Sequence, residues 1–329
     1  MKHTLKNKLI FIIIFAMGTI YGIIIQKYEI FPYRIIKYIY ANIYHRHYPN
    51  VYSQWSIGLY EGYSIYELDA PNDISNPILT QKDVNDIDAE FVADPFFIIK
   101  DNKYYTFFEI MNGSTNQGDI GYAVSDDGKR WKYQNVIIDE AFSLSYPYIF
   151  EWNDEYYLIP ESHEDLSVRL YKAAEFPDNW VYVGNILSGY HFTDPSILRY
   201  NDLWWIFVTS YPNSDVLNLY YSNNLLGEWK SHPMNPIVKL NKNYARNGGR
   251  VIIDHNKIYR FAQNQYPNYG TSVNAFEIKK LTEDSYLEII ASNKPIINMT
   301  GKGWNKTGMH NIDLQKVENR WIAIVDGRD

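Results

Sequence analysis

The segment ADPFFIIKDNKYYTFFE (93–109) contains a polar corner, a short strand, a tight turn and an aromatic-rich strand that ends in a polar residue. The same arrangement recurs four more times, as SYPYIFEWNDEYYLIPE (145–161), TDPSILRYNDLWWIFVT (193–209), NGGRVIIDHNKIYRFAQ (247–263) and HNIDLQKVENRWIAIVD (310–326). Repetition at about 50 residues is typical of a propeller or a similar array. A ring of such units would direct equivalent residues at one axis.

The repeat contains two matched sets of mostly polar positions. The corner set is Asp94, Tyr146, Asp194, Gly248 and Asn311, and the set that lies 15 residues later is Glu109, Glu161, Thr209, Gln263 and Asp326. Two short strands joined by a turn account for this offset, so both sets should finish at the same end of each hairpin. Any one of these residues could simply satisfy backbone groups at a turn. Two matched sets favour a functional rim.

Between the repeats lie second hairpins, such as DIGYAVSDDGKRWKYQNVII (119–138), and four strands per repeat make one propeller blade. The fifth copy ends about two strands in, and the strand-like stretch SQWSIGLYEGYSIYEL (53–68) can supply the missing pair. Donating that pair would close the ring and remove exposed edges. We therefore predict an all-β fold, a five-bladed β-propeller over residues 51–329 that is closed by an N-terminal strand pair and preceded by one transmembrane helix.

The N-terminal region differs in composition from the repeats. Residues 9–25 are uncharged and almost wholly apolar. The length of this segment is near the shortest that spans a bilayer as a helix. No small-residue cleavage site follows, which favours an uncleaved anchor within residues 1–27. Residues 28–50 are predicted to form an amphipathic juxtamembrane linker, with a plain linker helix as the alternative.

Orientation and source are inferred from charge and composition. Three lysines precede the apolar segment and three basic residues follow it, so the positive-inside rule barely discriminates between the two orientations. The Ile-, Asn-, Lys- and Tyr-rich composition resembles that of an AT-rich bacterium. We predict a single-pass protein of the bacterial inner membrane with its propeller outside the cytoplasm.

Composition excludes several classes of function. A formal charge of −7 without a basic stripe in the repeats argues against a nucleic-acid partner. The absence of Cys excludes disulfides, thiolate catalysis and cysteine-based zinc sites. No motif indicates a cofactor, and no ligand set indicates a metal. The 17% aromatic content, with 31 Tyr and 9 Trp, suits packing between blades and also sugar-stacking surfaces.

At these motifs the chain resembles the five-bladed propellers of the furanosidase superfamily, which includes glycoside hydrolase family 43. The resemblance implies a general base at Ala93-Asp94-Pro95, a carboxylate that tunes the acid at Thr193-Asp194-Pro195, and an axial histidine at His310. The family's fourth corner carries the acid. Here that corner reads Arg246-Asn247-Gly248-Gly249-Arg250 and has no carboxylate.

The motifs are more similar to those of the propeller found beside the glycosyltransferase domain of glucosamine inositolphosphorylceramide transferases and beside a formyltransferase-like domain in bacterial proteins. Matching stretches include Ser145–Ser162, Leu219–Trp229, Arg246–Gln263 and His310–Gly327. The resemblance covers about residues 53–329. It implies the fold and a glycosyltransferase partner, and it leaves the reaction open.

Glycoside hydrolysis would need an acid and a base or nucleophile among the rim carboxylates. For an inverting hydrolase we predict Asp94 as base, Glu161 or Glu109 as acid, and Asp194 as the neighbour that raises the pKa of the acid by repulsion. The arginines of the fourth corner oppose this assignment, because a guanidinium lowers the pKa of nearby carboxyl groups.

The arginines suit a carbohydrate ligand that carries a phosphate or carboxylate. The predicted substrate-binding residues are Arg246, Arg250, His310, Gln263, Tyr146 and Asp326. The alternative is that both arginines pair with Asp94 and Asp194 to neutralise an acidic channel.

The sequence thus predicts a membrane-anchored, glycosidase-like propeller for the assembly or modification of bacterial surface polysaccharide. The alternative is a non-catalytic glycan-binding module that works with a glycosyltransferase. A platform for protein partners is a third possibility, because a fold does not fix a function.

Overall fold

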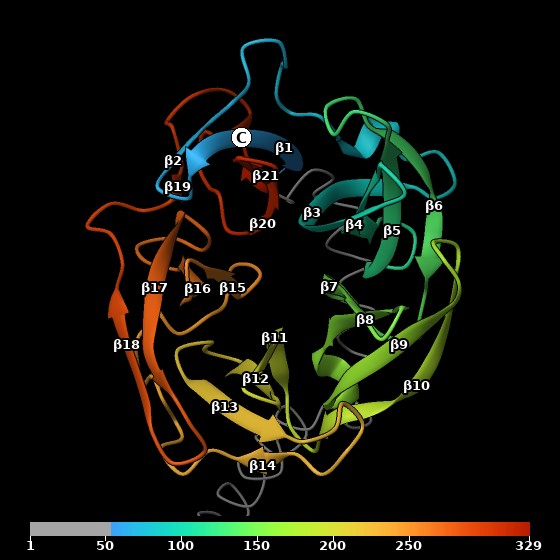
Figure 1. Ribbon diagram of the computed structural model, residues 1–329. Helices are drawn as coiled ribbons and strands as arrows, with labels where there is room; N and C mark the ends of the chain where they lie inside the picture. Colours follow the sequence, from blue (N-terminus) through green and yellow to red (C-terminus); the bar gives the residue numbers. More distant parts are fainter. Residues whose placement is uncertain (1–53) are drawn as a thin grey trace, which may run out of the picture. The chain divides into compact units, whose positions relative to one another are not determined.

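A computed structural model describes residues 54–329, which form a five-bladed β-propeller (Figure 1). The five sheets follow one another clockwise around a central axis in Figure 1, with the blade that contains β20 and β21 at the top. The all-β five-bladed fold predicted from the repeat is therefore confirmed. Within residues 54–329, no helix is long and apolar enough to cross a membrane. The predicted anchor and juxtamembrane linker lie outside the described residues.

Each blade is an antiparallel sheet, and in blades 1 to 4 the first strand lies nearest the axis. Blades 1 and 2 comprise β3 (Ala89–Lys100), β4 (Lys103–Asn112), β5 (Gln117–Ser125), β6 (Lys132–Ile138), β7 (Ser145–Trp152), β8 (Glu155–Ser162), β9 (Ser167–Glu175) and β10 (Asn179–Ser188). Blades 3 and 4 comprise β11 (Phe192–Tyr200), β12 (Leu203–Ser210), β13 (Leu217–Ser222), β14 (Lys230–Ser231), β15 (Ile252–Asp254), β16 (Lys257–Asn264), β17 (Ser272–Leu281) and β18 (Tyr286–Ile290), with β19 (Ile297–Asn298) on β17. Short 3₁₀ helices cover Gln81–Asp83, His163–Asp165 and Gly303–Asn305.

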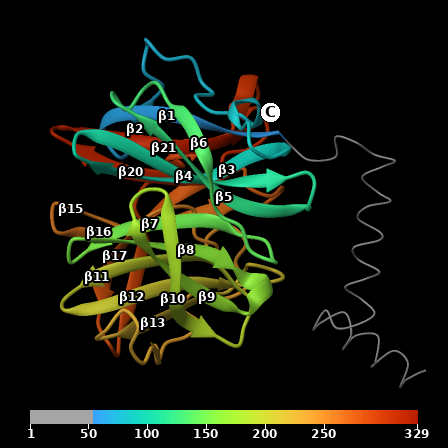
Figure 2. The same cartoon turned by 90° about the vertical axis from the view of Figure 1, so that its right-hand side faces the viewer.

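The fifth blade joins the two ends of the described chain. Its order is β2-β1-β21-β20, with β1 (Trp55–Ser64) and β2 (Glu67–Asp69) as outer strands and β20 (Ile312–Val317) and β21 (Arg320–Arg328) as inner strands. Eight residue pairs, from Trp55–Arg328 to Gly62–Trp321, hold β1 against β21. The same strands lie side by side in both views (Figure 1, Figure 2). The predicted closing strand pair is thus observed.

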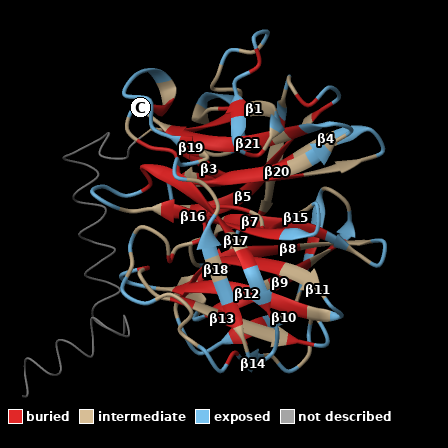
Figure 3. Cartoon of the chain, turned by 60° about the vertical axis from the view of Figure 1, so that its left-hand side comes forward, coloured by how far each residue is buried: buried red, intermediate tan, exposed pale blue. Residues whose placement is uncertain are grey.

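Apolar packing fills the space between neighbouring blades. Phe107 of blade 1 meets Trp180 of blade 2 edge to face, with ring centroids 5.7 Å apart, and both side chains are buried. Figure 3 shows buried residues concentrated in the inner strands, whereas the edge strand β18 carries exposed residues. Aromatic pairs of this geometry add to the stabilisation that burial gives. Much of the aromatic content therefore serves the core.

The closing strands should be required for folding. A chain that starts at residue 75 would lose β1 and β2, leave β21 as an open edge and expose the buried side chains that Ile57 and Leu59 cover. We expect this chain to be insoluble or to lack cooperative unfolding in circular dichroism, whereas a chain that starts at residue 53 folds. A soluble chain from residue 75 with a two-state transition would contradict the closure.

Candidate functional site

The corner residues adopt an unusual backbone conformation at the same place in three blades. Asp94, Tyr146 and Asp194 have φ values of 51°, 49° and 46°, and each lies where the strand pairing shifts register. Positive φ is uncommon for residues other than glycine, and bulges redirect side chains. The fourth copy has Gly248 at the corner position, and Gly249, which follows it, has a φ of 147°. The repeat thus builds a strained corner that turns these side chains out of the normal strand alternation.

The second set of residues pairs with the corners. Ala93 is opposite Glu109, Ser145 is opposite Glu161, and Thr193 is opposite Thr209. In blade 5 the backbone N–H of Asp326 donates to the carbonyl of Asn311. Both sets therefore finish at the same end of the hairpins, as the spacing predicted. We call the region around Asp94, Glu109, Glu161, Asp194 and Asp326 the axial end.

One arginine links two of the axial carboxylates. Arg246 Nε lies 2.5 Å from Asp194 Oδ2, and its Nη2 lies 3.7 Å from Glu161 Oε2. Gln263 Nε2 also donates to Asp194 Oδ2, at 2.8 Å, and Glu161 Oε1 lies 2.8 Å from His163 Nδ1. Arg246 therefore takes the neutralising role that the sequence left open as an alternative to ligand binding.

These contacts set the ionisation of Glu161. Burial opposes its charge, but the hydrogen bond and charge of His163, together with Arg246, lower the pKa of Glu161 to about 2. Burial raises the pKa of Asp194 well above its ordinary value against the attraction of Arg246. Glu161 is thus the carboxylate of this pair that stays ionised. A general acid needs the opposite shift, so the structure does not support Glu161 as the acid of a hydrolase.

A second cluster connects blades 5 and 1. His310 Nδ1 lies 2.7 Å from Asp326 Oδ2, and His310 Nε2 lies 3.4 Å from Asp94 Oδ1. Burial disfavours the charged imidazole, but the Asp326 and Asp94 carboxylates raise the pKa of His310 above its ordinary value. Burial also raises the pKa of Asp94 to about 6, although His310 opposes this shift. His310 is therefore oriented by Asp326 and presents its other nitrogen to Asp94.

Glu109 differs from the other axial carboxylates because nothing within the described chain pairs with it. Its side chain is buried, yet no donor among residues 54–329 hydrogen-bonds to its carboxylate and no cation there forms an ion pair with it. Burial, followed by the charges of Asp94 and Glu161, raises the pKa of Glu109 well above its ordinary value. An unpaired buried carboxylate is costly, and such groups mark candidate functional sites.

Four of the predicted substrate-binding residues are used inside the protein. Tyr146 is fully buried, and its hydroxyl bonds to Ser196 and Gly249. Asp326 accepts hydrogen bonds from the backbone N–H groups of Asp94, His310 and Asn311. Gln263 is also buried, against Asp194. These side chains therefore make contacts within the protein that hold the residues of the axial end in place.

Arg250 is the fourth, and its contacts tie the blades together. Its Nε and Nη2 bond to Asp313 at 2.7 and 3.0 Å, Nη1 donates to the carbonyl of Ile149 at 2.8 Å, and Nη2 also reaches the carbonyl of Phe97. Asp313 in turn accepts from the backbone N–H of Phe97. The guanidinium is therefore satisfied within the protein, and ligand binding by Arg250 stays a prediction.

Aromatic side chains that the sequence analysis did not select also lie at the axial end. Trp55 stacks on His310 with ring centroids 4.0 Å apart, and Tyr269 lies 5.2 Å from the same ring and 5.3 Å from the Arg246 guanidinium. Tyr211 stacks on His163 at 5.0 Å. Both Tyr211 and Tyr269 are partly exposed. They lie outside the repeated positions, so the repeat contains no signal for them.

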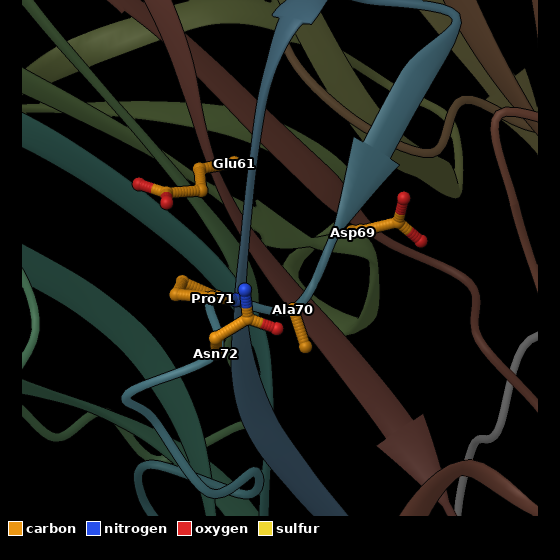
Figure 4. Close-up of a pocket in the computed structure, with 5 residues that line it drawn as sticks. All are labelled: Glu61, Asp69, Ala70, Pro71 and Asn72. Atoms are coloured by element: carbon orange, nitrogen blue, oxygen red, sulfur yellow. The ribbon is translucent and has the colours of Figure 1, made fainter.

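Two other features were considered as sites. Asp94, His310 and Asp326 could together offer three ligand atoms within 4.8 Å of one another to a cation, although ion pairing of His310 with the two carboxylates already accounts for this geometry. A recess of about 550 Å³ at the outer edge of blade 5 is lined by Glu61, Asp69, Ala70, Pro71 and Asn72 (Figure 4). It contains two carboxylates and no residue from the repeated positions.

Comparison with known proteins identifies similar sequences in plants. Residues 49–328 match the family described as "Glucosamine inositolphosphorylceramide transferase 1, N-terminal". A rice (Oryza sativa subsp. japonica) protein named glucosamine inositolphosphorylceramide transferase 1 is 34% identical over 304 residues, which are 85% of this chain and 40% of the rice protein. The Arabidopsis thaliana protein of the same name is 31% identical over 83% of this chain and 39% of its own length. The chain spans about two fifths of the length of these relatives.

Solved structures with similar folds are much less similar in sequence. A putative glycosidase from Bacteroides thetaiotaomicron has a TM-score of 0.62 and 12% identity, and the match covers 81% of this chain and 98% of that one. An exo-β-1,3-galactanase from Clostridium thermocellum has a TM-score of 0.54 and 11% identity, with 67% and 52% covered. At these identities the likeness concerns the fold alone.

These findings correct two predictions. The predicted role, a glycosidase-like propeller in the assembly or modification of bacterial surface polysaccharide, is wrong, because the related proteins are plant enzymes named for transfer to inositolphosphorylceramide. The predicted location in a bacterial inner membrane is contradicted by the same plant relatives, and the described residues contain no membrane-spanning helix. The bacterial setting in both predictions was inferred from amino-acid composition.

Stability should rise as the pH falls from 7.5 to 5. Asp94 has a pKa of about 6 in the folded protein against an ordinary value of 3.8, so the folded state binds this proton more tightly than the unfolded state does. Protonation of Asp94 therefore stabilises the fold, fully below pH 3.8, and this stabilisation is lost as the pH rises through 6. The raised pKa of His310 acts in the same direction. We expect a higher unfolding midpoint at pH 5 than at pH 7.5, and a smaller difference in Asp94→Asn but not in the exposed control Asp101→Asn. A midpoint that falls on acidification to pH 5 would contradict this expectation.

Removing the Arg250 guanidinium should destabilise the whole propeller. Arg250→Met leaves Asp313 buried without a cation, which typically costs about 3–5 kcal/mol. The control Arg320→Met breaks an exposed pair with Glu61 and should leave the free energy of unfolding almost unchanged. Urea denaturation measures both variants. Equal effects would show that the Arg250 pair has no special role.

Proposed function

The chain belongs to the family of the glucosamine inositolphosphorylceramide transferase 1 N-terminal domain, and we propose that its propeller recognises the sugar of a glycolipid during sphingolipid glycosylation. The names of the rice and Arabidopsis relatives support this context. In this proposal a glycosyltransferase that works with the propeller carries out the transfer, and the axial end holds the carbohydrate.

One observation carries the proposal: buried polar groups and aromatic rings meet at the axial end. Tyr269 lies beside both His310 and Arg246, and Trp55 stacks on His310. Sugars present hydroxyl groups at their edges and apolar faces between them, so sites that bind them combine hydrogen-bonding groups with aromatic surfaces. Tyr and Trp suit this task because each has an apolar body and a polar tip.

The ionisation of the carboxylates favours binding over hydrolysis. Glu161 is held as an anion by His163 and Arg246, and Asp194 is bound to Arg246 and Gln263. Glu161 therefore has no proton to deliver to a leaving group, and Arg246 and Gln263 both contact Asp194 Oδ2. These groups would instead orient the hydroxyl groups of a bound sugar, which donate hydrogen bonds to carboxylates.

Saccharide binding to the full chain tests the proposal. We expect at least one member of a panel of methyl glycosides and glycosyl inositol phosphates to bind in isothermal titration calorimetry. Tyr269→Ala should weaken that binding about tenfold, the equivalent of about 1.4 kcal/mol, because the ring lies against both His310 and Arg246.

Tyr63→Ala is the matched control, because this tyrosine is 73% exposed on the outer strand β1. Its affinity should equal that of the unchanged chain. If no saccharide binds, or if both variants bind equally well, the axial end is not the carbohydrate site.

A further inference from the structure

Four loops of blades 3 to 5 form one continuous surface beside the axial end. They are residues 211–216, 239–246, 265–271 and 299–309. Two of them come just after Thr209 and Gln263, and the other two lead into the corner residues Gly248 and Asn311. Backbone N–H groups of one loop donate to carbonyls of its neighbour, from Asn241 to Asp215, from Gln265 to Lys242 and from Met299 to Thr271, at 2.9, 2.9 and 3.0 Å. We call these four segments the rim loops.

Large apolar and aromatic side chains of the rim loops are exposed to solvent. Leu240 is 83% exposed and Tyr266 is 67% exposed, and Tyr211, Tyr269 and Met299 are exposed as well. Leu240 also has a φ of 50°, which is unusual for a bulky residue. Because backbone hydrogen bonds join the loops, these side chains belong to one surface. Exposed patches of this kind mark sites of interaction with a partner or a membrane.

The rim loops also carry positive charge. Their exposed cations are Lys239, Lys242, Lys302 and Lys306. Residues 239–246, 265–271 and 299–309 contain no Asp or Glu, and Asp215 is the single acidic residue in the rim loops. The chain as a whole has a formal charge of −7. The rim loops are therefore a positive region of an otherwise acidic protein.

The opposite end of the propeller is acidic. The turns between the first two strands of each repeat lie there, on the side away from the chain end marked C in Figure 2. Each of these turns contains or adjoins an acidic residue, and the five are Asp101, Asp154, Asp202, Asp254 and Glu318. At the axial end itself, the loops of blades 1 and 2 contain Asp139, Glu140 and Glu164. A negatively charged surface would therefore attract the rim loops and repel the rest of the propeller.

The combination of lysines with exposed apolar side chains identifies the kind of partner. Interfaces between proteins are depleted in Lys, whereas protein surfaces that lie in a membrane interface combine Lys and Arg with apolar side chains such as Leu. Tyrosines are also enriched at the level of the lipid headgroups. A polyanion in water would attract the lysines but would offer no apolar surroundings to Leu240 or Met299. The side chains of the rim loops therefore match an anionic bilayer.

From this distribution we propose that the rim loops dock the propeller on an anionic lipid bilayer. Leu240 and the exposed tyrosines enter the headgroup region, and the lysines contact the lipid phosphates. This contact is made by the propeller itself and does not involve the apolar segment 9–25. It turns the axial end toward the membrane surface. The inference goes beyond the proposed carbohydrate function, because no sugar takes part in docking.

The experiment uses fluorescent labels on the full chain, which contains no cysteine, so that a single introduced cysteine carries the label. Asn268→Cys places the label in a rim loop, and Asn319→Cys places it in the exposed β20–β21 turn at the opposite end. Vesicles of phosphatidylcholine and phosphatidylserine contain a spin-labelled lipid as the quencher. We expect quenching at Asn268→Cys and not at Asn319→Cys. High salt or vesicles of phosphatidylcholine alone should lower this quenching, because both reduce the electrostatic attraction.

Charge reversal tests the role of the lysines. In the Asn268→Cys chain, Lys242→Glu combined with Lys302→Glu should lower the docked fraction about tenfold, because each lysine near an anionic surface contributes to binding. The matched control combines Lys103→Glu with Lys257→Glu, which are exposed lysines at the opposite end. This control should be quenched like the unchanged chain. Circular dichroism shows whether both variants are folded.

Three outcomes would overturn the inference. They are equal quenching of the two labels, no quenching of either, and quenching that survives the reversal of Lys242 and Lys302 in a folded chain. If this reversal instead changes the oligomeric state in analytical ultracentrifugation, the rim loops bind a second copy of the chain and not a bilayer. Because the assay contains no saccharide, failure of the inference would leave the proposed carbohydrate function intact. Saccharide binding that fails in calorimetry would likewise leave the docking result unchanged.

Discussion

The arrangement of the blades depends on the Arg250–Asp313 pair near the axis. Arg250 comes from blade 4 and Asp313 from blade 5, and together they bond to the backbone of Phe97 in blade 1 and Ile149 in blade 2. Four of the five sheets thus meet on one buried ion pair. A pair with every donor and acceptor satisfied specifies how the sheets are placed, whereas apolar packing alone tolerates small rotations between them.

The repeats converge on one axis, and this convergence, which also forms the Arg250–Asp313 pair, brings the carboxylates of the axial end close together. Each repeat directs a corner residue and its partner at one axis, so Asp94, Glu109, Glu161, Asp194 and Asp326 come together whether or not their charges suit one another. Arg246 and the two histidines compensate for part of this charge. The remainder is a cost in stability that the fold tolerates, and sites that bind ligands commonly carry such a cost.

The fold is shared with a putative glycosidase at 12% identity, so that comparison concerns the scaffold alone. In this chain Arg246 lies at the fourth corner and contacts Asp194 and Glu161. A guanidinium at this place keeps a neighbouring carboxyl ionised and unsuited to donate a proton. This is why we propose that the axial end holds a sugar and does not cleave it.

Much of this protein could be predicted from its repeat. The five copies of the repeat gave the number of blades, and the incomplete fifth copy required the strand pair around Trp55–Asp69. The 15-residue offset placed Glu109 at the same end as Asp94. These features depend on contacts within one hairpin or on pairing between chain ends, and strand periodicity records both. Composition was a poorer guide, because it indicated a bacterial setting that the plant relatives contradict.

Other features were decided by the tertiary structure. Arg246 and Arg250 lie four residues apart and look equivalent in the sequence, yet one neutralises Asp194 and the other joins Asp313. Tyr269 and Trp55 reach His310 from segments outside the repeated positions. Such partnerships depend on the angles at which whole blades meet, and no local pattern encodes those angles. The sequence by itself determined the ring and the acids that face its axis, whereas only the tertiary structure decided which acids are paired, because pairing depends on distances between blades.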